Sequence, residues 1–349
     1  MGVSKRNKNI ELLRIISMLM IVYHHYYVHS GWVFPNEFSG KAAFIIIMGS
    51  MGRIGVILFV LITGYFYSQQ ELKPKKILAL SNAARWYAIL SLIIVIFFTD
   101  TKLELTAQEI VPALFPVGFG YYWFLIPYVI LLLLNPFIRN YLVSVDRKKK
   151  LLATLLLIVV LHIPSLIGII TQTEGYYVPS SLLTFFYFVL IGDLLKNYQH
   201  ELATKYFNYV VLLFVFSGML LVYKGLFYQP YAVEDFPKLP AFFLTGIESI
   251  NALVFSATLF VIVLTKISIK KNLVLFVAPL VFDVYLLHDN RYIRPLIWQT
   301  IFNNKESFDS SWLILRSIFE PLVVFIVCLL FGFVRFTLFG VVKRKFQKN

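Results

Sequence analysis

Continuous apolar runs of about twenty residues recur along the whole sequence, separated by short charged segments. A helical run of this length matches the hydrocarbon thickness of a bilayer. Only 14% of the 349 residues are charged and 59% are hydrophobic, which leaves too little polar surface for a soluble domain. The sequence therefore predicts an all-α fold, a polytopic bundle of helices embedded in a membrane.

Ten segments qualify as spanning helices within one membrane domain over residues 1–349; they are 10–29, 43–66, 77–98, 121–140, 151–170, 179–195, 208–228, 241–265, 272–289 and 312–342. Lysine and arginine favour alternate connecting segments, beginning with the N-terminal one, by about three to one. Because basic loops face the cytoplasm, this bias predicts that both termini are cytoplasmic. It also accounts for the net charge of +14, so nucleic acid is not an expected partner.

The first predicted helix carries four ionisable side chains on one face. Glu11 and Arg14 are one turn apart, so the carboxylate can orient the guanidinium. His25 lies within about 20° of the direction of Arg14 and about 16 Å farther along the axis. His29 is one turn beyond His25, whereas His24 points about 80–100° away. Each residue alone has a structural explanation, but their alignment indicates a functional stripe.

Arg53 falls near the middle of the second predicted helix, where a charge has to face a wet cavity, an anion or a carboxylate. Asp283 in the ninth predicted helix is a candidate partner at similar depth. The nearby glycines, Gly49, Gly52 and Gly55, permit close approach of another helix or a ligand. Arg53 therefore has two open interpretations, a contact to an anionic donor or a structural ion pair with Asp283.

Other kinds of site leave no signature in the sequence. The six histidines are dispersed and Cys328 is the single cysteine, so no metal site is predicted. There is no phosphate loop, dinucleotide fingerprint or nucleophile elbow. Buried charges alone fit an enzyme, a transporter or flippase for lipid-linked saccharides, or a polysaccharide polymerase. Many transporters contain internal repeats, and the sequence shows none. Its loops are also short for a polymerase.

Four short motifs occur in order along nearly the whole chain. They are Glu11-Leu-Leu-Arg14 followed by His25, the segment 55–66 with Thr63-Gly64-Tyr65, Tyr122-Trp123-Phe-Leu leading to Asn135-Pro136, and Tyr285-Leu-Leu-His288. The ordered set resembles the acyltransferase type three family of bacterial integral membrane proteins. Two features depart from the family pattern. Thr63 replaces the usual serine, and the family's Arg-x-x-Arg segment is missing, with only Lys75, Lys76 and Arg85 nearby.

The resemblance implies an O-acyltransferase of the bacterial cytoplasmic membrane. It would move an acyl group, in the first instance acetyl, from cytoplasmic acyl-CoA to a hydroxyl of a cell-surface or lipid-linked glycan. Acetyl-CoA would be a donor substrate rather than a permanently bound cofactor, and the other partners would be the carbohydrate acceptor and membrane lipid.

The residue roles combine these motifs with the positions of the charged side chains along the predicted helices. His25 would be the catalytic group, as general base or as covalent acyl carrier, with Glu11 orienting Arg14. Arg14 and Arg53 would bind the donor phosphates. Further candidates for shaping the cavity or stabilising the oxyanion are Tyr65, Trp123, Tyr285, His288 and Asp283.

Overall fold

The computed structural model describes residues 6–99, 105–171, 181–227 and 249–346. Helices make up 80% of the chain, and these residues contain no β-strand. The predicted all-α class is therefore confirmed. Within the described residues, four helices are long and apolar enough to cross a membrane, or up to six when each sharply bent pair is counted as one span.

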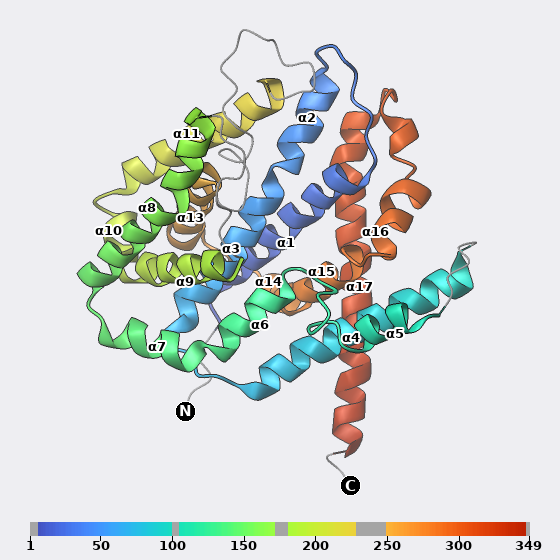
Figure 1. Cartoon of the computed structure of the whole chain (residues 1–349), viewed down its shortest axis with the longest axis horizontal. Helices are drawn as coiled ribbons and strands as arrows, with labels where there is room; N and C mark the ends of the chain where they lie inside the picture. The colour runs from blue at the N-terminus through green and yellow to red at the C-terminus, as the bar shows by residue number, and fades with distance from the viewer. Residues whose placement is uncertain (1–5, 100–104, 172–180, 228–248, 347–349) are drawn as a thin grey trace.

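Figure 1 shows the arrangement of the helices. In chain order they are α1 (Lys8–His29), α2 (Gly40–Gly49), α3 (Met51–Tyr67), α4 (Pro74–Phe98), α5 (Ala107–Leu114), α6 (Leu125–Leu133), α7 (Asn135–Ser144), α8 (Arg147–Thr171), α9 (Ser181–Asn197), α10 (Gln199–Ala203), α11 (Phe207–Phe227), α13 (Ile250–Lys266), α14 (Leu273–Val277), η1 (Ala278–Leu280), α15 (Val281–His288), α16 (Ile293–Pro295), η2 (Leu296–Ile301), η3 (Lys305–Ser307) and α17 (Leu313–Phe346).

The ten predicted segments are helical over most of their described residues. The segment 43–66 is divided between α2 and α3 at Ser50, and two further segments are split or bent more sharply. The segment 121–140 is split into α6 and α7, which differ in direction by 61°. Pro136 lies in the first turn of α7, and since it has no N–H to donate, α6 cannot continue through it. The segment 272–289 continues beyond a turn of 89° into helical residues up to Ser307. Residues 241–248 of the eighth segment lie outside the described part.

The centre of the bundle is the packing of α1 against α3. An added Cβ on Gly52 would lie 2.2 Å from the Cβ of His24, and one on Gly55 would lie 2.4 Å from the carbonyl oxygen of Ser17. These glycines therefore admit α1 at a distance that a larger residue would forbid. The Ser17 hydroxyl donates to the carbonyl of Gly55 at 3.1 Å, which joins the two helices at this point.

The outer helices present large apolar side chains outward, as lipid-facing helices do. On α11, Leu212 and Met219 are both 64% exposed, and on α17 Leu330 is 60% exposed. Figure 1 shows α17 along one side of the bundle and α8, α10 and α11 on the other, with α1 and α3 between them. The polar groups of the central helices are thus enclosed by apolar ones.

Candidate active site

Two pockets lie along α1, and the ionisable side chains at the two ends of this helix line different pockets. The first contains His25 and His29 near the C-terminal end of α1, and we call it the His25 pocket. The second contains Arg14 nearer the N-terminal end, and we call it the Arg14 pocket. They enclose about 820 Å³ and about 800 Å³, including their open mouths.

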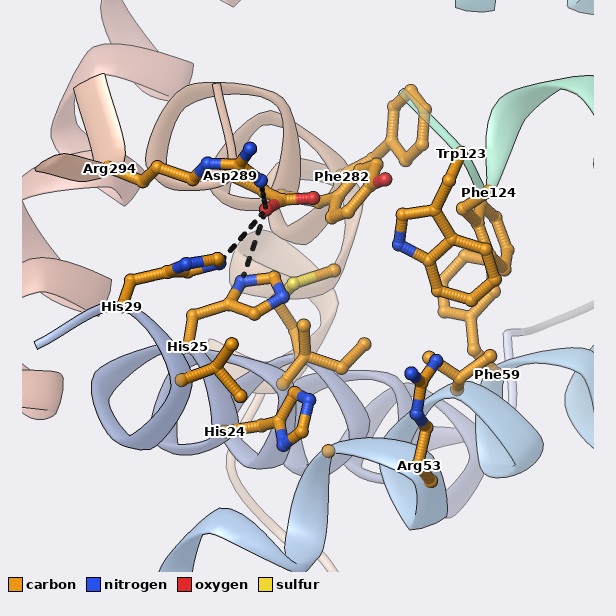
Figure 2. Close-up of a pocket in the computed structure, with 16 residues that line it drawn as sticks. His24, His25, His29, Arg53, Phe59, Trp123, Phe124, Phe282, Asp289 and Arg294 are labelled. Atoms are coloured by element: carbon orange, nitrogen blue, oxygen red, sulfur yellow. Dashed lines mark hydrogen bonds and ion pairs between the residues drawn. The ribbon is translucent and has the colours of Figure 1, made fainter. Parts of the chain in front are cut away.

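The His25 pocket has a polar side and an aromatic side. Figure 2 shows His24, His25, His29, Asp289 and Arg294 on one side, and Arg53, Phe59 and Trp123 on the other. His25 is 7% exposed, and its ring projects from α1 into the space between the two sides. A polar group that reaches His25 therefore enters a largely apolar, aromatic enclosure, as substrates do in many small-molecule sites.

Asp289 and Arg294 reach the pocket because the chain turns sharply after α15. Asp289 is the C-cap residue of α15, and the next helical residues run at 89° to it. The side chain of Asn290 secures this corner by accepting from the backbone N–H of Tyr292 at 3.0 Å and donating to the hydroxyl of Tyr122 at 3.2 Å. The corner thereby fixes a carboxylate beside the histidines.

The Asp289 carboxylate has several neighbours. Its Oδ1 lies 3.7 Å from Nδ1 of His25, 3.9 Å from Nε2 of His29 and 3.5 Å from Nη1 of Arg294. Asp289 is only 6% exposed, so its charge acts on the imidazoles with little screening by water.

The other histidines of the site make defined contacts. The Nδ1 of His25 lies 2.8 Å from Nε2 of His288, which is fully buried on α15. The Nδ1 of His24 donates to the carbonyl of Gly49 at 2.5 Å, so His24 borders the pocket near the end of α2. The predicted difference in direction between His24 and His25 is present, although both line the same pocket.

The Arg14 pocket is rich in cations. Its lining includes Arg6, Arg14 and Lys76. Glu11 is 3% exposed and accepts from Arg14 at 2.6 Å and from Arg6 at 2.9 Å and 3.1 Å. The predicted pairing of Glu11 with Arg14 is confirmed, and Arg6 adds a second guanidinium. One carboxylate thus holds two arginines at the edge of a pocket suited to a phosphate-bearing ligand.

A family model described as an acyltransferase domain matches residues 7–339, nearly the whole chain. The chain belongs to the acyltransferase type three family. Its membership and its apolar helices make it a multi-pass membrane acyltransferase. Searches of curated proteins and of solved structures found no match.

Within this acyltransferase, Arg14 and Arg53 face different pockets. The guanidinium of Arg53 lies 5.5 Å from the ring centre of Trp123, and both residues line the His25 pocket. A guanidinium over an indole face is a favourable cation–π pair. The two residues expected to bind the donor together are thus divided, with Arg14 in the pocket of cations and Arg53 beside the histidines.

Two of the candidate site residues lie elsewhere. The interpretation of Asp283 as the ion-pair partner of Arg53 is wrong, because both oxygens of Asp283 accept from Arg335 on α17. The hydroxyl of Tyr65 donates to Gln199 at 2.8 Å, and Tyr65 lines neither pocket. Asp283 also lies outside both pockets, and its ion pair with Arg335 joins α15 to α17.

The fold also assembles a group that the dispersed histidines did not reveal. His25, His29 and Asp289 each place one ligand-type atom within 4.8 Å of the others. Two imidazoles and a carboxylate are ligands that zinc accepts. However, Nδ1 of His25 is already engaged by His288 at 2.8 Å, so a metal bound through that atom would have to displace this contact.

Sequence reasoning missed the residues that complete the pocket. Asp289 directly follows the Tyr285-Leu-Leu-His288 motif, so a carboxylate beside a family motif was the available signal. Phe59 lies within the motif segment 55–66, so the same kind of signal was available for it. Arg294 and Phe282 carried no comparable signal, because their place in the site follows from the arrangement of the chain around α15.

Proposed function

We propose that this protein is an O-acyltransferase that moves an acyl group, most simply acetyl, from acyl-CoA to a hydroxyl of a cell-surface or lipid-linked glycan. One observation carries the proposal. A single helix, α1, presents Arg14 to one pocket and His25 to another, and Phe59 and Phe282 line both pockets. The phosphate-bearing part of a donor can therefore bind on one side of these two aromatic side chains and an acceptor on the other. The reacting groups of the two substrates would meet at His25.

The Arg14 pocket fits the phosphate-bearing part of the donor. Arg14, Arg6 and Lys76 offer three cations there, and guanidinium groups bind phosphate oxygens in bidentate fashion. Lys76 contributes a positive charge although the Arg-x-x-Arg segment is missing. From this pocket the flexible arm of the donor would carry its thioester along α1 toward His25.

The His25 pocket fits the reaction centre. The Nε2 of His25 would take the proton of the acceptor hydroxyl while the hydroxyl oxygen bonds to the thioester carbonyl carbon. The C–S bond then breaks, and the leaving thiolate takes the proton back from His25, which yields the ester and free thiol. In the alternative route, Nε2 would itself carry the acyl group before the hydroxyl accepts it. Arg53 and Trp123 would hold the group that enters from the opposite side.

We extend the proposal to the orientation. Ten spanning helices with both termini in the cytoplasm of a bacterial plasma membrane would open the Arg14 pocket toward cytoplasmic acyl-CoA. The His25 pocket would then open toward the outer face. The distribution of basic residues among the loops supports this orientation.

The test is the acetate content of the surface glycan in cells with wild-type protein, with His25→Ala, and without the protein. His200→Ala is the matched control, because His200 is exposed on α10. We expect acetate with the wild type and the control, and its loss with His25→Ala at equal membrane abundance. Equal acetate in cells with and without the wild-type protein would contradict the function, whereas unchanged acetate with His25→Ala would contradict the role of His25.

A further inference from the structure

His288 is the buried neighbour of His25, and its own hydrogen bonds define where its proton lies. Its Nδ1 is 2.5 Å from the carbonyl oxygen of Val284, one turn earlier on α15. A carbonyl oxygen can only accept, so Nδ1 of His288 carries the hydrogen. The opposite neutral tautomer would direct a nitrogen lone pair at an oxygen lone pair across this short contact.

The charge of His288 follows from its burial. Its side chain is 0% exposed, and an imidazolium there would be a buried cation whose ring contacts another imidazole rather than a carboxylate. The carboxylate of the corner, Asp289, is instead placed next to His25, His29 and Arg294. His288 is therefore neutral, and its Nε2 holds a lone pair.

That lone pair faces His25. Because Nε2 of His288 can only accept, Nδ1 of His25 must donate across the 2.8 Å contact. We infer that His288 is a positioning residue that holds His25 in the tautomer with the hydrogen on Nδ1 and the lone pair on Nε2. The inference rests on the proposed function only in that this lone pair then serves the acyl transfer.

The arrangement has a chemical consequence at His25. In water the neutral imidazole side chain favours the tautomer with hydrogen on Nε2, which would present a donor to the pocket. The contact with His288 reverses this preference and presents a base or nucleophile instead. When Nε2 takes a proton, Nδ1–H remains directed at His288, and the Asp289 carboxylate 3.7 Å from Nδ1 stabilises the new charge.

The two hydrogen bonds that link His25 to His288 and His288 to the Val284 carbonyl also explain why no carboxylate has to accept directly from His25. A carboxylate in hydrogen-bond contact would hold the proton on Nδ1 equally well, yet Asp289 lies beyond hydrogen-bond distance. The neutral imidazole of His288 fixes the tautomer, and Asp289 supplies charge from slightly farther away. Orientation and electrostatic stabilisation are thus divided between two adjacent residues.

The direct test is nitrogen-15 NMR of histidine-labelled protein in liposomes, in which His25→Ala identifies the His25 signals by difference. In the wild type we expect His25 to show a protonated Nδ1 and an unprotonated Nε2. In His288→Phe, which fills the space without an acceptor, we expect His25 to shift toward the Nε2-protonated tautomer. A wild-type His25 with hydrogen on Nε2, or a tautomer unchanged by His288→Phe, would overturn the inference.

Kinetics supply a second readout with a matched pair of variants. His288→Phe should lower kcat for acetyl transfer at least about tenfold and leave KM for acetyl-CoA within about twofold, since removing an orienting partner affects the chemical step. His288→Gln, whose side-chain oxygen can accept from His25, should recover part of that loss. Equal kcat in the two variants would overturn the inference. A side chain that only fills space at position 288 would not need to accept a hydrogen bond, so Phe and Gln would then give the same kcat.

His162→Phe controls for the replacement of a buried histidine away from the pocket. If His288→Phe fails to fold, the wild-type tautomer and His288→Gln still decide the outcome. The NMR measurement needs no acyl donor. A wild type that transfers no acetyl group would therefore contradict the proposed function, and the tautomer of His25 would still be read separately.

Discussion

Phe59 on α3 and Phe282 on α15 line both the His25 pocket and the Arg14 pocket. Phe59 is held in place by edge contacts, with its ring centre 5.7 Å from that of Phe124 and 6.0 Å from that of Tyr128. The two rings therefore stand where a donor bound at Arg14 would have to pass to reach His25. Apolar groups at such a position limit the access of water to a reactive thioester.

Truncating one of these two side chains should allow acetyl-CoA to be cleaved without transfer of the acetyl group. We expect Phe59→Ala to raise acetyl-CoA hydrolysis severalfold relative to acetyl transfer, because water gains access to the thioester. The ratio is measured in liposomes by thiol release with and without a glycan acceptor. Phe137→Ala is the control, since Phe137 is 75% exposed on α7. An unchanged ratio in Phe59→Ala would refute this role.

Loss of the Arg14 guanidinium should weaken donor binding. A hydrogen bond to a charged group contributes about 1.5–3 kcal/mol, so Arg14→Gln should raise KM for acetyl-CoA about ten- to a hundredfold. Glu11→Gln should have a smaller effect in the same direction, because Glu11 holds both Arg14 and Arg6. Steady-state kinetics at saturating acceptor measure both. Arg147→Gln, on the surface at the start of α8, should leave KM unchanged.

Neutralising Asp289 should slow the chemical step. The carboxylate lies 3.7 Å from Nδ1 of His25, so it stabilises the imidazolium that forms during proton transfer. We expect Asp289→Asn to reduce kcat about ten- to a hundredfold, with little change in KM for acetyl-CoA. The exposed Asp309→Asn serves as the comparison. A larger effect on KM than on kcat would instead assign Asp289 to binding.

The ion pair of Asp283 with Arg335 should contribute to stability. Removing one partner of a buried pair costs about 3–5 kcal/mol, because the other charge is left without it. Arg335→Gln should therefore lower Tm clearly in detergent. The double variant Asp283→Asn/Arg335→Gln should recover much of the loss. Additive losses in the double variant would show that the two side chains act independently.

The first half of the site is predictable from the sequence because it lies on one helix. Helical periodicity alone aligns Glu11 with Arg14 and His25 with His29, and the structure has the Glu11–Arg14 pair and a His25–His29 ring distance of 5.2 Å. The close approach of α1 to α3 also follows from small residues at Gly52 and Gly55.

The second half depends on how helices are arranged, which periodicity does not encode. Asp289 enters the pocket because the chain turns by 89° after α15, and this turn is stabilised by Asn290 against Tyr122, 168 residues away in sequence. Arg53 was the predicted partner of Asp283 because both residues lie at a similar depth in their helices. The choice of Arg335 required knowing that α17, and not α3, lies beside α15.

The pairing of Asp283 with Arg335 also has a consequence for biogenesis. Ribosomes make the chain from its N-terminus, so Asp283 is synthesised 52 residues before Arg335. Until α17 arrives, a carboxylate of the ninth segment lacks the guanidinium that later binds it, in a surrounding that disfavours charge. A chain interrupted before Arg335 would therefore carry the Asp283 carboxylate on α15 without the guanidinium that binds it in the folded protein.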